Sequence, residues 1–160
     1  MPEAAPAFVR NLPKVELGAG GYVIDPEGRL LLIDQERPGA RHWGSIGGGL
    51  ERGESVRDCA VREIFEESGL RVRIEKLVAV YEMYRADQLF AVGFMFVTAP
   101  DPWPQDVRLP ARDGAAAFHG YGWFAREEIA ALDVFADDLV VTHWPPDVEA
   151  PHWFRRDLPA

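Results

Sequence analysis

The segment from Gly47 to Leu70, GGGLERGESVRDCAVREIFEESGL, constrains the fold more than any other part of the chain. Three consecutive glycines open it, and they let the backbone approach a ligand closely or adopt positive φ. Ser55 then offers an N-cap, with Asp58 three residues later, and Gly69 has the position of a C-terminal glycine. These signals predict a glycine-rich loop that leads into a helix from about Val56 to Ser68.

The predicted helix has two chemically different sides. At about 100° per residue, the apolar side chains fall on one arc, which we expect to face the core, and the acidic ones on another. The apolar set is Val61, Ile64 and Phe65, and the acidic set is Glu63, Glu66 and Glu67. Cys59 is the only cysteine, which excludes an intrachain disulfide, and we expect it to fill space in the core.

Runs rich in β-branched and aromatic residues on both sides of the helix predict strands. The expected strands are Val15–Ile24, Arg29–Asp34, Val72–Tyr84, Leu89–Thr98 and, as the last one, the short run Tyr121–Phe124. The first two flank a turn-forming stretch, which indicates a hairpin-like pair. Residues 35–53 and the proline-rich residues 100–114 are expected to be loops, with short helices over Arg126–Leu132 and near Asp137–Thr142.

Size and composition exclude several classes of protein. A chain of 160 residues, 48% of them hydrophobic, suits one domain, which we assign to residues 15–160 after an N-terminal arm at 1–14. The formal net charge of −9 argues against a nucleic-acid partner, because counterion release needs a basic face. No long apolar segment suggests a membrane span or a secretory signal, so the expected location is the cytoplasm.

The acidic triplet of the helix raises an electrostatic question. Glu63, Glu66 and Glu67 occur at i, i+3 and i+4, so their carboxylates converge. Each like-charged pair costs only about 0.2–0.5 kcal/mol, so a solvated acidic face explains the triplet by itself. The setting favours a functional interpretation, because Glu54 stands at the helix entrance, Arg62 lies in the same turn and a glycine-rich loop precedes both.

Carboxylate oxygens of this kind suit Mg²⁺, with Mn²⁺ as the alternative. Such an ion would neutralise the glutamates, bridge them to an anionic substrate and lower the pKa of a bound water. Arg62 would orient the glutamates through charge-assisted hydrogen bonds. The alternative for Arg62 is a simple i,i+4 salt bridge to Glu66.

The same residues resemble a known family. The segment Gly48–Leu70 matches the Nudix box, G-x5-E-x7-R-E-U-x-E-E-x-G-U with U apolar, at all nine specified positions. The order of the flanking strands is also similar to Nudix proteins, as is Trp123-Phe124 followed by Glu127-Glu128-Ile129. The resemblance therefore extends over Val15–Leu132.

The resemblance implies an α/β fold, a Nudix-type α/β/α sandwich with a mixed β-sheet. It also implies an enzyme, a pyrophosphohydrolase in which water attacks phosphorus in a diphosphate linkage of a small nucleotide. The metal ligands that it implies are Gly47 through its carbonyl, Glu63, Glu66 and Glu67. The implied catalytic set is Glu54, Arg62, Glu63 and Glu66, with Glu63 or Glu66 favoured as the general base.

Two departures from the family pattern affect the site. Ile46 stands where many members have a proline before the paired glycines. Many members also place a carboxylate shortly before the Trp-Phe pair, whereas residues 116–120 contain no acid. The nearest substitutes are Asp113, His119 and Glu82, and the sequence does not choose among them.

The substrate stays open among nucleoside triphosphates, ADP-ribose and nucleotide sugars, because substrate choice would lie in residues 37–46, 99–120 and the tail. Trp43 is the best aromatic candidate for a wall of the site, and Arg37, Arg41 and His42 are candidates to meet phosphate or sugar. Residues 145–154 either fold over the site or serve a homodimer. The alternative functions are a catalytically silent Nudix-like nucleotide-binding or regulatory module and a metal-free helical adaptor.

Overall fold

The computed structural model describes residues 14–134 and 138–159. The expected N-terminal arm therefore lies, apart from Lys14, outside the described residues. Within the described ranges, no helix is both long enough and apolar enough to cross a bilayer.

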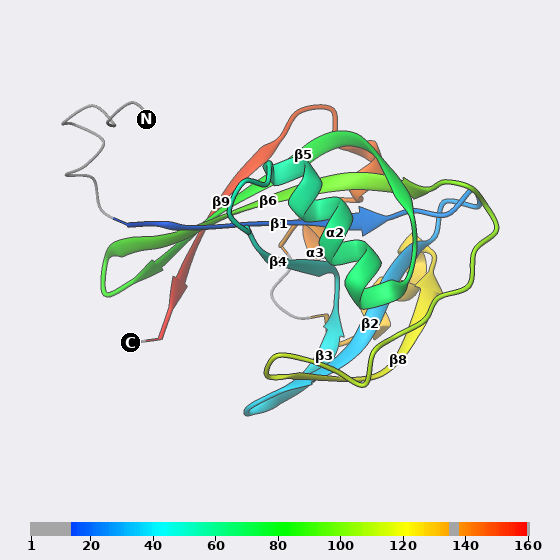
Figure 1. Cartoon of the computed structure of the whole chain (residues 1–160), viewed down its shortest axis with the longest axis horizontal. Helices are drawn as coiled ribbons and strands as arrows, with labels where there is room; N and C mark the ends of the chain where they lie inside the picture. Colours follow the sequence, from blue (N-terminus) through cyan, green and yellow to red (C-terminus); the bar gives the residue numbers. More distant parts are fainter. Residues whose placement is uncertain (1–13, 135–137, 160) are drawn as a thin grey trace.

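Two β-sheets form the framework (Figure 1). The larger sheet has the strand order β4 (Ile46–Gly49), β1 (Glu16–Val23), β6 (Gln88–Pro100), β5 (Val72–Arg85) and β9 (His152–Leu158). It is mixed, because β1 pairs with β6 and β5 with β9 in parallel, whereas the other pairs are antiparallel. The smaller, antiparallel sheet has the order β3 (Ala40–Gly44), β2 (Leu30–Arg37), β8 (Ala116–Phe124) and β7 (Arg112–Asp113).

Helices cover both faces of the larger sheet, which confirms the expected α/β/α sandwich. On one face, helix α2 (Val56–Ser68) packs Cys59 and Ala60 against Ala19 and Phe96. The opposite face packs against the 3₁₀ helices η1 (Arg126–Ala131) and η2 (Pro145–Asp147) and the short helix α3 (Asp138–Thr142). The burial of Cys59 confirms its expected role in the core.

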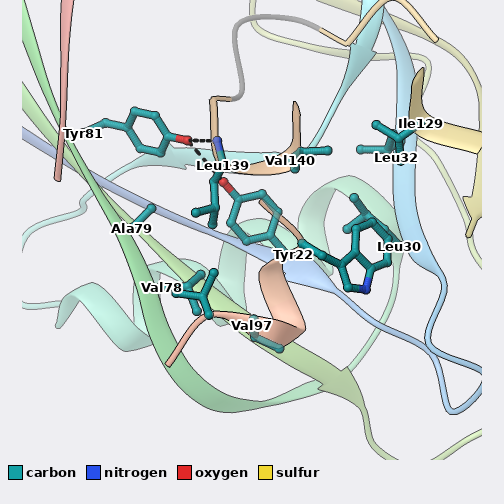
Figure 2. Close-up of a cluster of buried hydrophobic side chains, with 12 residues drawn as sticks. Tyr22, Leu30, Leu32, Val78, Ala79, Tyr81, Val97, Ile129, Leu139 and Val140 are labelled. Atoms are coloured by element: carbon teal, nitrogen blue, oxygen red, sulfur yellow. Dashed lines mark hydrogen bonds between the residues drawn. The ribbon is translucent and has the colours of Figure 1, made fainter. Parts of the chain in front are cut away.

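A pair of tyrosines connects the larger sheet to α3 inside this second core (Figure 2). The hydroxyls of Tyr22 and Tyr81 lie 3.5 Å apart, and the Tyr81 hydroxyl accepts a 3.3 Å hydrogen bond from the backbone N–H of Leu139. The polar atoms of both rings are thereby satisfied among apolar neighbours.

The sequence predicted the bounds of α2 correctly. The Ser55 hydroxyl accepts a 3.1 Å hydrogen bond from the N–H of Asp58, which caps the first turn. Gly69 ends the helix in the left-handed conformation, with φ of 73°, and its N–H donates to the carbonyl of Phe65.

Several strand predictions were wrong. Val15–Ile24 and Arg29–Asp34 contain strands, but these belong to different sheets and meet only at the isolated bridge between Ile24 and Leu30. The expected loop at residues 35–53 contains β3, β4 and the end of β2. Strand β8 begins at Ala116, before the predicted start, and it is not the last strand, because β9 follows it.

Glycine explains why β4 was not predicted. A side chain on Gly20 of β1 would collide with the carbonyl of Ile46, so the β1–β4 pair closes only around bare backbone. Glycine has low intrinsic β-propensity, so a strand that needs it is hidden from propensity arguments.

Candidate active site

The buried side of α2 carries two of the predicted site glutamates. Glu63 and Glu67 are only 6% and 3% exposed, and they lie on the same arc as Cys59, Ala60 and Ile64. Phe65, which we expected in the core, is 50% exposed. The prediction of separate apolar and acidic arcs was therefore wrong, because two carboxylates share the buried arc with small and apolar residues.

Three carboxylates meet at this point. Oxygens of Glu63 and Glu67 from α2 and of Asp113 from β7 all lie within 4.8 Å of one another. Asp113 was one of three candidates to replace the carboxylate that residues 116–120 lack. The other two are engaged elsewhere, since His119 Nε2 lies 2.7 Å from Glu36 and Glu82 accepts a hydrogen bond from Tyr84.

Burial of the two glutamates is electrostatically unfavourable without a cation. Burial raises the pKa of Glu63, and burial together with the neighbouring Asp113 raises the pKa of Glu67 to about 9. Three converging carboxylates, two of which are buried with raised pKa values, fit a divalent cation that prefers oxygen ligands. The donor set is therefore chemically suited to Mg²⁺ or Mn²⁺.

Arg62 connects most of the predicted residues. Its Nε donates to Glu54 at 2.6 Å, and its Nη1 donates to Glu63 at 2.7 Å and to Glu66 at 3.1 Å. Its Nη2 donates to Glu54 and to the carbonyl of Gly49. The salt bridge to Glu66 is thus one contact among several, and the guanidinium holds the glutamates in fixed positions.

The two glutamates that were predicted alongside Glu63 and Glu67 have different surroundings. The hydrogen bond from Arg62, with help from the backbone of Glu51, lowers the pKa of Glu54 to about 2. The side chain of Glu66 is half exposed and lies outside the group of three carboxylates. Its role as a metal ligand stays a prediction.

Strand β4 separates the carboxylates from a cavity of about 530 Å³. On one side, a Cβ on Gly48 would collide with the carboxylate of Glu63, so only glycine permits this contact. Gly47, Gly48 and Gly49 all line the cavity. The glycine strand therefore lets a ligand in the cavity reach the region of the carboxylates.

The floor of the cavity is largely bare backbone. One row across the larger sheet pairs Gly49 with Gly18, Gly18 with Gly93, and Gly93 with Tyr81. Residues paired in this way project to the same face of a sheet, so three adjacent strands present no side chain here. A Cβ on Gly93 would meet only the end of Met83, at 3.8 Å.

The structure distinguishes among the candidates for substrate contact. Arg37 and His42 line the cavity, and burial lowers the pKa of His42. Arg41 instead forms two hydrogen bonds with Asp34, at 3.0 and 2.8 Å. Trp43 packs edge-on against Phe124, with ring centroids 5.1 Å apart, and does not line the cavity.

Sequence analysis missed the cavity residues Gln35, Tyr81 and Arg156. Gln35 was expected to lie in a loop, whereas Tyr81 lies on a predicted strand for which the sequence did not show which face points to the cavity. Arg156 belongs to β9, and the only available signal was the alternation of residue types in HWFRRDL.

Comparisons with known proteins point to the family that the sequence resembles. The model of the NUDIX domain matches residues 14–145. The oxidized purine nucleoside triphosphate hydrolase of Mus musculus is 30% identical over 138 residues, which cover 78% of this chain and 73% of the relative. The nucleoside diphosphate-linked moiety X motif 6 protein of Mus musculus is 32% identical over 83 residues, 51% of this chain. That match spans only 26% of this second relative.

A solved structure shares the fold. The NUDIX hydrolase from Nitrosomonas europaea superposes with a TM-score of 0.63 at 18% identity, and the match covers 94% of this chain and 82% of that one. At this identity the similarity concerns the architecture alone.

Proposed function

This chain belongs to the Nudix family, and from that premise we propose that it is a divalent-metal-dependent pyrophosphohydrolase of small nucleotides. The observation that carries the proposal is the group formed by the buried Glu63 and Glu67 and the exposed Asp113, beside a glycine strand that lines a cavity. Arg62 supplies a partner charge for Glu63, but Glu67 lies beside the carboxylates of Glu63 and Asp113, and an ion that binds there explains this arrangement best.

We assign metal binding to the carboxylates of Glu63, Glu67 and Asp113 and to the carbonyl of Gly47, with Glu66 as a further ligand. When bound, Mg²⁺ or Mn²⁺ supplies Lewis acidity and a water of lowered pKa. Arg62 keeps Glu63 and Glu66 in place through its hydrogen bonds, and Glu54 in turn fixes Arg62. Glu63 or Glu66 takes the proton of the attacking water.

Arg37 is the cation that this proposal assigns to the substrate phosphates. It lines the cavity, and its positive charge favours the ionised form of Glu67, one of the carboxylates assigned to the metal. Arg41, the other arginine of this segment, is already paired with Asp34. A guanidinium suits phosphate oxygens because it offers several donors in one plane.

Nucleoside triphosphates are the first substrate class to test, since the mouse relative that matches over most of its length is named as a hydrolase of such compounds. ADP-ribose and nucleotide sugars are the next classes. The expected location of the protein remains the cytoplasm, and a homodimer remains a prediction from the tail.

The test is a panel of nucleoside triphosphates, ADP-ribose and nucleotide sugars, incubated with Mg²⁺, with Mn²⁺ and with a chelator. We expect turnover of at least one compound, dependence on the cation, and loss of turnover in Glu67→Gln. Glu127→Gln, which removes an exposed carboxylate on η1, is the matched control and is expected to retain activity. Turnover in the presence of chelator, or equal rates for Glu67→Gln and wild type, would contradict the proposal.

The silent-module alternative predicts a different result in the same panel. Nucleotide binding without turnover of any compound, under conditions where the cation binds, would favour that alternative over the enzyme.

A further inference from the structure

We propose that Arg156, on the C-terminal strand β9, is a specificity-determining residue of the cavity. Its guanidinium donates hydrogen bonds to an acceptor oxygen on the part of the nucleotide that is farthest from Glu63, Glu67 and Asp113. This inference rests on the proposed function, because it concerns the same substrate site.

Strand β9 lies beyond the residues that the NUDIX domain model matches. The NUDIX domain model ends at residue 145, whereas β9 spans His152–Leu158. The strand pairs in parallel with β5 along its whole length, and Arg156 lies opposite Met83. A segment outside the family match thus completes one wall of the cavity.

The alternation along β9 sends neighbouring arginines to opposite faces. His152, Phe154, Arg156 and Leu158 are partly buried, whereas Trp153, Arg155 and Asp157 are exposed. Arg156 lines the cavity. Arg155 lies away from it, donates to Asp157 at 2.8 Å and to Asp87 at 3.3 Å, and stacks over Tyr84.

The position of Arg156 follows from a row across the sheet. Glu16 pairs with Ala91, Ala91 with Met83, and Met83 with Arg156, and all four residues line the cavity. The next row is the glycine floor described above. Arg156 therefore lies at the β9 edge of the floor. Strand β4, next to the carboxylates, forms the opposite edge of the same sheet.

An aromatic platform holds the guanidinium at this end. The Tyr81 ring stacks on Phe154, with centroids 5.0 Å apart, and the Arg156 guanidinium lies 5.1 Å from the Tyr81 centroid. A cation over a ring face is attracted to it and loses part of its freedom. A guanidinium carries several N–H donors in one plane, which suit paired or single oxygen acceptors.

The chemistry of the cavity indicates what Arg156 meets. A flat group fits on a floor without side chains, and phosphates would lie toward β4 and the carboxylates. The far group then carries an oxygen acceptor, which is either a keto oxygen on a nucleobase or an oxygen of a second, distal phosphate. Both oxygens accept hydrogen bonds from a guanidinium, and comparing the kinetics of different nucleotides distinguishes them.

The experiment measures kcat and KM for wild type, Arg156→Ala, Arg156→Lys and the matched control Arg155→Ala. The substrates are GTP and ITP, which have a keto group at position 6, ATP, which has an amino group there, and diadenosine tetraphosphate, which carries a distal phosphate. We expect Arg156→Ala to raise KM about 10- to 100-fold for the substrates that carry the acceptor, with kcat changed little. Arg156→Lys is expected to recover part of the loss, and Arg155→Ala to stay within about 2-fold of wild type.

A preference of wild type for GTP and ITP over ATP that disappears in Arg156→Ala identifies a base keto oxygen. A loss confined to diadenosine tetraphosphate identifies the distal phosphate. Unchanged KM values in Arg156→Ala and Arg156→Lys, or an equal rise in Arg155→Ala, would overturn the inference. Melting temperatures of all variants show whether a loss of binding reflects a loss of folding.

Titration calorimetry of the same nucleotides in the presence of chelator separates this inference from the proposed function. Binding that depends on Arg156 without any turnover by wild type would support the role of Arg156 and contradict the hydrolase proposal. Turnover by wild type together with unaltered binding by Arg156→Ala would support the hydrolase proposal and contradict the role of Arg156.

Discussion

Glu63 and Glu67 occupy helix positions where a protein normally places apolar side chains. Their carboxylates are nearly inaccessible, and burial raises the pKa of both groups, so the helix gives up stability at these positions. Such a cost persists in proteins where the groups bind a ligand that compensates for it. Asp113, which lies on strand β7 of the smaller sheet, is the third carboxylate of the group. It brings the end of the proline-rich segment close to α2.

Asp113→Asn tests whether this third carboxylate contributes to metal binding. Removing one negative charge from the group is expected to weaken Mn²⁺ binding about 10-fold or more, because carboxylate charge dominates the affinity of such sites. Calorimetric titration of the nucleotide-free protein with Mn²⁺ measures the change. Asp106→Asn, an exposed position in the same loop, is the control, and similar affinities for the two variants would exclude Asp113 from the site.

Arg62→Lys tests the role of the guanidinium. An ammonium keeps the charge but cannot serve Glu54, Glu63 and Glu66 together, so the glutamates lose their fixed positions. We expect kcat/KM to fall about 10- to 100-fold, which corresponds to the loss of one or two charge-assisted hydrogen bonds. Arg57→Lys, on the exposed side of the same helix, is expected to keep wild-type kinetics, and an equal effect of both changes would point to the helix as a whole.

Most of these residues could be predicted from the sequence, but their burial and their neighbours could not. The spacing of the box was enough to single out Glu54, Arg62, Glu63 and Glu67, since chemistry depends on residue type and separation. It did not reveal that Glu63 and Glu67 are buried, because a helical arc has no fixed orientation until its neighbours are known. Asp113 could not be chosen over His119 or Glu82, because that choice depends on the path of a long loop.

The ends of α2 show what local sequence determines well. Ser55 and Gly69 set the bounds of the helix through contacts within a few residues, so the prediction did not need the rest of the fold. The pairing of β1 with β4 depends instead on a close approach between glycines far apart in the sequence. Such pairings give no local signal, and the hairpin expected between β1 and β2 was wrong for the same reason.

Gly69→Ala is expected to destabilise the protein by about 1–2 kcal/mol. Residue 69 has φ of 73°, where a side chain is strained, and the new Cβ would lie 3.3 Å from Cβ of Arg108. Urea denaturation monitored by circular dichroism measures the free energy of unfolding. Gly120→Ala is the control, since that position has open space and no positive φ, and a change as large as that of Gly69→Ala would rule out the cap explanation.

Gly93→Val tests the glycine floor of the cavity. A strand tolerates valine, and the added Cβ meets only the flexible end of Met83, so folding should be retained. The branched side chain would occupy the space where a flat group lies, and KM for the best nucleotide substrate is expected to rise about 10-fold or more. The melting temperature serves as the folding check, and an unaltered KM would show that the ligand does not use this floor.

The two sheets and the helices on both faces of the larger sheet form one framework (Figure 1). We expect the buried charges of this framework to affect the free energy of global unfolding. The layered architecture was predicted from the family resemblance, but β9 was not. Its alternation of residue types extends over only a few residues and follows the proline pair Pro145-Pro146. This strand matters because it extends the larger sheet and adds Arg156 to the cavity. The tail is therefore part of the folded framework.

The metal-free protein is expected to lose stability as pH rises from 7 to 8.5. Glu67 has a pKa of about 9 in the folded protein, far above the value of an unfolded glutamate, so in this range the folded state holds a proton that the unfolded state has released. The free energy of unfolding then falls with increasing pH. The lowered pKa of Glu54 acts only at acidic pH and leaves this window unaffected.

Melting temperatures at pH 7, 7.5, 8 and 8.5 in the presence of chelator measure this slope. The lowered pKa of His42 has the opposite effect at acidic pH, below this range. The raised pKa of Cys59 adds to the fall in stability near pH 8.5, where the thiol of the unfolded chain begins to ionise. Glu67→Gln is expected to flatten the slope, because the amide has no proton to lose, whereas Glu127→Gln should retain it. Mg²⁺ or Mn²⁺ should flatten the slope of the wild type as well, since a cation favours the charged carboxylates in the folded state. Equal slopes of melting temperature against pH for Glu67→Gln and wild type in chelator would show that the buried carboxyl group of Glu67 does not cause the pH dependence.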